Sequence, residues 1–165
     1  MNIYDHFQYS EWIARHMKSI AHTDDSCHFL KSDEIEEISD LEERMSVISD
    51  RVLIAIDGLD SFFDWHNDEN LMHSPQFYTA IIMHADNGNI DSIHAVKEIC
   101  KTLIMELISH MMQDFESCKN GLEFLDPTSM IIHGIGPVAD NFYGVQLGFS
   151  VNNPISFNID ESKWI

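Results

Sequence analysis

The feature that most constrains the fold is the alternation of large apolar residues with small or polar ones over positions 141–151, the cleanest in the sequence. This period of two predicts a β-strand, because successive strand residues point to opposite faces. One predicted face is formed by Tyr143, Val145, Leu147, Phe149 and Val151. An apolar face of this size must be covered, so the chain needs a second element with a matching surface.

A long helix predicted over residues 91–116 supplies that surface. Asp91 or Ser92 is expected to cap the start of this helix, and Lys119-Asn120-Gly121 is expected to end it. Its apolar positions recur at helical spacing: Ile93, Val96, Cys100, Leu103, Ile104, Leu107, Ile108, Met111 and Phe115. We expect this face to pack against the alternating strand.

The remaining elements are predicted from shorter patterns. Helical spacing indicates one helix near residues 3–20 and a second, acidic one over 32–48. Strands are expected at 51–57, fully buried, with 62–66 as its hairpin partner, and at 76–85, 130–135 and 155–159. Residues 67–75 are predicted to form a polar loop. Gly136-Pro137 is expected to end the strand at 130–135. Residues 27–30 are predicted to be either a strand or a linker.

This order of elements predicts an α+β fold. Because short turns join the strands, we expect a mainly antiparallel sheet with helices packed on one face. The 165 residues, of which 44% are hydrophobic, suffice for one domain, with a helical part at 1–49 and the sheet with the long helix at 50–159.

The charge is strongly negative. Twenty-eight Asp and Glu against nine Lys and Arg give −19 with neutral histidines, a balance that disfavours binding to nucleic acid or to a membrane surface. Seven of the acids stand in the run from Asp33 to Glu43. That run is expected to be a solvated face, with a surface that repels nucleic acid or one that docks a basic partner as the alternatives.

Ten histidines raise the question of a metal site. The densest cluster contains His22, Asp24, Asp25, Cys27 and His28, whose side chains are all of metal-binding type. Their spacing matches no known closed site, so we expect a polar loop without a bound metal. No motif indicates a catalytic residue or a cofactor, so we assign no catalytic residue and expect no cofactor.

The second face of the alternating strand is a candidate contact surface. It carries Gly144, Gln146 and Gly148, and glycines there permit close approach of another backbone or another subunit. A solvent-facing strand with small residues is the alternative. The predicted edge strand around Phe157 is a further candidate interface.

The element order resembles the small tail-terminator, or tail-completion, proteins of long-tailed phages and prophage-like elements. The similarity involves Ile20-Ala-His-Thr23, the strand at 52–57, the strand at 76–86 before one long helix, and above all Asp140-Asn-Phe-Tyr-Gly-Val-Gln-Leu-Gly-Phe-Ser150. It implies a structural subunit without catalysis, located in the virion or the bacterial cytoplasm. It further implies a homo-oligomeric ring, typically hexameric, that contacts other tail or connector proteins.

Two other classes compete with this expectation. An acidic adaptor or regulatory domain would stay monomeric and bind a distinct partner. A metal-dependent enzyme would hold stoichiometric metal or present a pocket with convergent titratable groups.

Overall fold

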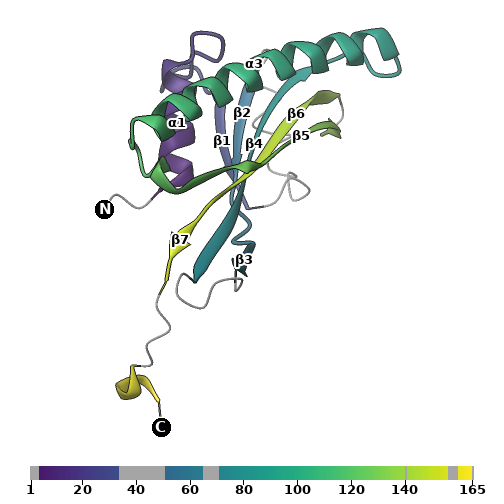
Figure 1. Cartoon of the computed structure of the whole chain (residues 1–165). Helices are drawn as coiled ribbons and strands as arrows, with labels where there is room; N and C mark the ends of the chain where they lie inside the picture. The colour runs from purple at the N-terminus through teal and green to yellow at the C-terminus, as the bar shows by residue number, and fades with distance from the viewer. Residues whose placement is uncertain (1–3, 34–50, 65–70, 140, 156–159, 165) are drawn as a thin grey trace.

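The computed structural model describes residues 4–33, 51–64, 71–139, 141–155 and 160–164. A twisted, mostly antiparallel sheet forms its centre, and the helices α1 (His6–His16) and α3 (Ile90–Glu116) lie across one face of it (Figure 1). The predicted α+β class is therefore confirmed. None of the described helices combines the length and the apolar character needed to cross a bilayer.

The central sheet has the order β1-β2-β4-β6-β5. Its strands are β1 (Phe29–Ser32), β2 (Val52–Ile56), β4 (Met72–His84), β5 (Leu125–Val138) and β6 (Phe142–Val151). β1 and β2 are parallel, whereas every other pair is antiparallel. Two short strands, β3 (Ser61–Asp64) and β7 (Asn153–Pro154), pair with the first residues of β4. Short 3-10 turns lie at η1 (Leu122–Phe124) and η2 (Glu161–Lys163).

The main core lies between the sheet and the helices. The apolar side chains of β6, from Tyr143 to Val151, belong to one buried cluster with Val96, Leu107 and Met111 of α3. The packing that the alternating pattern predicts is thus confirmed. α1 adds Tyr9 and Ile13 to the same cluster, next to β2.

A smaller buried cluster lies on the second face of the sheet. It contains Leu30, Val52, Ile54, Ile56, Ala80, Ile82 and Val138. All five residues of β2 are buried, as its continuous apolar run predicts for a strand covered on both sides.

Two strand predictions are wrong at their boundaries or partners. β3 pairs with β4 and not with β2, which lies between β1 and β4. β4 begins at Met72, inside the predicted polar loop, because cross-strand contacts hold its polar residues. Buried Ser74 donates a hydrogen bond of 2.6 Å to Asn152 Oδ1, and such distant partners leave no local signal in the sequence.

β5 is longer than the predicted strand 130–135. It begins before Pro127 and runs through Gly136-Pro137, where a break was expected. Because β5 is at the edge of the sheet, a missing N–H on its outer side removes no ladder hydrogen bond. Register shifts between Asp126 and Ile131 and between Ile135 and Val138 absorb the irregular ends.

The helix ends also differ from expectation. Asn89, and not Asp91 or Ser92, caps α3, its side chain accepting the Ser92 N–H at 3.1 Å. α1 ends at His16, before the predicted limit at residue 20. The open alternative at residues 27–30 is resolved in favour of a strand, since β1 occupies 29–32. The predicted helix at 32–48 and strand at 155–159 fall almost wholly outside the described residues.

Candidate functional site

The predicted contact residues of β6 lie on the second face of the sheet. A Cβ atom at Gly144 would overlap with the carbonyl oxygen of Ile81 in the paired strand β4. At Gly148 it would lie 3.0 Å from the Tyr78 ring and 3.3 Å from Ile131 Cγ2. Both glycines are therefore covered by their own chain, and the more accessible position of the three is Gln146. Phe157 lies outside the described residues.

The outer edge of β5 is the most accessible long strand edge of the described sheet. β5 spans 14 residues and is hydrogen-bonded there to β6 alone. From Pro127 to Val138 it contains no Asp, Glu, Lys or Arg, in a chain of net charge −19. Ile131, in its middle, is 51% exposed.

The middle of this edge lacks the usual protection against strand pairing. Natural proteins shield exposed edges with charged side chains, bulges, prolines or very short strands. β5 has prolines and bulges only towards its two ends, whereas residues 131–135 form a regular, neutral segment paired with β6. That segment can accept a further strand through its free backbone groups.

The tip of the molecule beyond the central sheet carries exposed aromatic rings. Phe62 and Phe63 of β3 are both about half exposed, and the Phe63 ring stacks on His73 of β4 with centroids 5.1 Å apart. Figure 1 shows β3, β7 and the start of β4 extending away from the helices. This protruding end offers a second accessible surface with apolar side chains.

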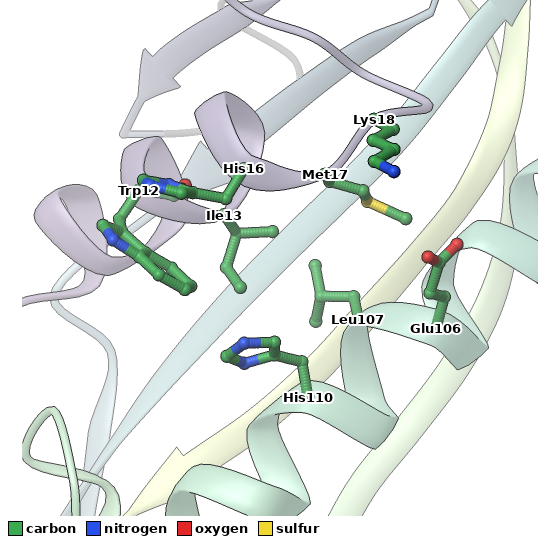
Figure 2. Close-up of a pocket in the computed structure, with 8 residues that line it drawn as sticks. All are labelled: Trp12, Ile13, His16, Met17, Lys18, Glu106, Leu107 and His110. Carbon is green, nitrogen blue, oxygen red and sulfur yellow. The ribbon is translucent and has the colours of Figure 1, made fainter.

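A pocket of about 410 Å³ opens between α1 and α3. Figure 2 shows its lining residues converging from the end of α1 and the middle of α3. The lining consists of Trp12, Ile13, His16, Met17, Lys18, Glu106, Leu107 and His110. It has apolar and aromatic walls with one ammonium and one carboxylate, a composition typical of sites that receive a partly apolar group.

Aromatic rings form one wall of the pocket. The Trp12 indole stacks on the His16 ring at 4.2 Å and meets the His110 ring at 5.2 Å, measured between centroids. His16 Nδ1 donates a hydrogen bond of 2.7 Å to the Trp12 carbonyl oxygen, which fixes the orientation of that ring. Trp12 remains 40% exposed, so its indole is accessible to a partner.

The buried carboxylate of Asp114 contacts His110, one of the aromatic rings of this wall. Asp114 Oδ2 accepts hydrogen bonds from the Tyr9 hydroxyl at 3.0 Å and the Asn120 amide at 2.9 Å, and lies 3.4 Å from His110 Nδ1. Burial, followed by the Asp114 charge, raises the pKa of Tyr9, so its hydroxyl stays a donor. The network holds His110 in place, and the i,i+4 spacings Trp12–His16 and His110–Asp114 are its only trace in the sequence.

The histidine cluster at residues 22–28 is held by internal hydrogen bonds. His28 bonds to the Ser26 hydroxyl at 2.8 Å through Nε2 and to the Arg51 carbonyl oxygen at 3.0 Å through Nδ1, and its N–H donates to His22 Nδ1. Asp24 pairs with Arg15 at 2.8 Å, while Asp25 and Cys27 are exposed. Across the described ranges, no three His, Cys, Asp or Glu side chains are grouped to hold a metal ion.

The acidic run from Asp33 to Glu43 lies outside the described residues, apart from Asp33 itself, which is exposed. Its predicted role as a solvated face or a docking surface stays a prediction.

Comparisons with family models, curated proteins and solved structures found no match to this chain. The candidate surfaces therefore rest on geometry: the β5 edge, the protruding tip and the α1–α3 pocket.

Proposed function

We propose that this chain is a non-catalytic assembly subunit that joins copies of itself into a closed ring, like the tail-terminator proteins it resembles. The observation that carries the proposal is the long, neutral outer edge of β5, with which no strand of the described residues pairs. An edge of this kind is an aggregation hazard for a protein that acts alone, and a designed contact for one that assembles.

The two sheet edges favour a ring over a symmetric pair. β5 forms one edge of the central sheet and the short parallel strand β1 forms the other, so the two edges are not alike. A contact between unlike surfaces repeats head to tail and closes when the rotation permits. In the tail-terminator resemblance, that closed form is a hexamer at the junction of tail tube and head connector.

The charge supports a role next to passing DNA. A ring of subunits that each carry −19 would surround its channel with negative potential, which repels phosphate groups. In this proposal the subunit guides DNA without binding it, and its partners are further tail or connector proteins.

The test is the mass in solution of the wild type and of two lysine variants. Ile131→Lys places a charge in the centre of the β5 edge and should lower the assembled mass well below that of the wild type. Met105→Lys, which alters a similarly exposed apolar residue on α3, should leave the assembly intact. Size-exclusion chromatography with light scattering measures the mass, and circular dichroism checks that both variants fold.

Two outcomes would contradict the proposal. A wild type that stays monomeric at high protein concentration would favour the adaptor class. If both folded variants lose assembly equally, the added positive charge disrupts assembly wherever it is placed, and the β5 edge is not the specific contact.

A further inference from the structure

The segment after β7 carries an exposed aromatic residue. Trp164 follows the turn η2 and is 74% exposed, and its only described hydrogen bond runs from its backbone N–H to Glu161. Figure 1 shows η2 lying apart from the sheet and the helices. We define residues 160–164 as the arm. Burial of this exposed indole against a partner would be favourable, because it removes a large apolar surface from water.

The α1–α3 pocket has the chemistry to receive that indole. Its lining includes the apolar side chains of Met17 and Leu107 and the accessible Trp12 ring. His16 and Tyr9 stack on that indole, so a further aromatic ring can pack against it edge to face. The volume of about 410 Å³ accommodates one large side chain together with part of its backbone.

The rim of the pocket complements the charges of the arm. Among the described residues Lys18 has no ion-pair partner, although the chain has three times as many acids as bases. The arm offers Asp160 and Glu161, and its Lys163 can meet Glu106 on the other side of the pocket. In the free arm Lys163 bonds only to exposed Asp160, at 3.4 Å, a contact that is easily exchanged.

We propose that the arm of one copy docks into the α1–α3 pocket of a second copy, with the Trp164 indole against Trp12 and the arm carboxylates facing Lys18. A second copy is favoured over the same chain because β6 and β7 lead away from the helices (Figure 1). This contact is separate from the β5 edge and goes beyond the proposed function, since it gives neighbouring copies an exchanged arm.

Isotope-mixed cross-linking of the full chain tests the proposal. Unlabelled and ¹⁵N-labelled protein are mixed in equal amounts at high concentration, treated with an amine-reactive cross-linker and digested for mass spectrometry. Links between Lys18 and Lys163 should form. Links that join one labelled and one unlabelled peptide should make up about half of them, as expected for contacts between randomly mixed copies. Lys31, which pairs with Glu11 away from the pocket, should show no enriched link to Lys163.

Variants separate this contact from the β5 edge. Trp164→Ala should reduce the Lys18–Lys163 links at least tenfold, whereas Leu59→Ala, which alters another highly exposed apolar residue, should leave them unchanged. Links confined to same-isotope pairs would mean that the arm folds back on its own chain. That result, or an absence of links, overturns arm exchange, while the masses of the Ile131→Lys and Met105→Lys variants still decide the proposed function.

Discussion

His6 shows how one buried residue ties this fold to pH. It is 3% exposed and packs against the rings of Phe77 and Phe149. Its Nε2 lies 2.9 Å from the Tyr78 carbonyl oxygen and must donate, so its Nδ1, 3.1 Å from the Tyr4 hydroxyl, accepts. Burial lowers its pKa from 6.5 to about 4, because a charge there would lose its hydration.

We therefore expect acid to destabilise the fold in a defined window. The unfolded chain protonates this histidine near pH 6.5 and the folded chain only near pH 4, so stability falls as pH decreases between these values. The expected loss from His6 is about 3 kcal/mol. Denaturant unfolding of His6→Gln at pH 7, 5.5 and 4 should show a shallower pH dependence than the wild type.

The exposed His84 provides the control. His84→Gln should keep the wild-type pH dependence. If His6→Gln also keeps it, His6 is not the group that titrates.

Single glycines show the limit of residue-level prediction. The alternating pattern correctly places Gly144 and Gly148 on one face, and it indicates that something lies close to them. It cannot tell that the neighbours are Ile81 and Tyr78 of the same chain, because register between strands is set by pairing across the sheet.

At the scale of elements, the contact between β6 and α3 organises the main core. Leu147 and Leu107 are both almost fully buried in one cluster. Leu147→Asp or Leu107→Asp should each destabilise the fold by more than about 4 kcal/mol, because an unpaired carboxylate would enter an apolar core. Thermal melts followed by circular dichroism measure this.

Met105→Asp is the matched control on the exposed side of α3 and should melt close to the wild type. Wild-type melting of both core variants would mean that β6 and α3 do not form the core.

Elements with a strong local period are the ones that the sequence predicts well. β2, β6 and α3 have long apolar patterns, and their observed bounds lie within a residue or two of expectation. The start of β4 depends on a partner distant in the chain, as Ser74 and Asn152 illustrate. The ends of β5 depend on register shifts in its pairing with β6, which no local pattern predicts. The α1–α3 pocket is non-local in the same way, since it requires Trp12 and His110 to meet across two helices.

For the whole molecule, the net charge opposes the proposed assembly. Copies of −19 repel, and salt shortens the range of that repulsion from about 8 Å at physiological strength to about 3 Å at 1 M. The assembled mass should therefore rise with salt and with protein concentration. Light scattering over a salt series measures this, with sucrose as an uncharged control.

A mass that falls as salt rises would show the opposite balance, in which attraction between charges holds the copies together. The proposed arm contact would contribute such attractions through Lys18, but they are few beside the net charge.

The pairing of β4 has a mechanical consequence. β3 and β7 hold one end of this 13-residue strand, while β2 and β6 hold the rest, so a single continuous backbone joins the protruding tip to the middle of the sheet. A force applied at the tip is transmitted along the β4 backbone. It acts as shear on the hydrogen bonds that pair β4 with β2 and β6, and β4 has no break at which a hinge could bend. Tip and body must therefore turn together as one stiff lever.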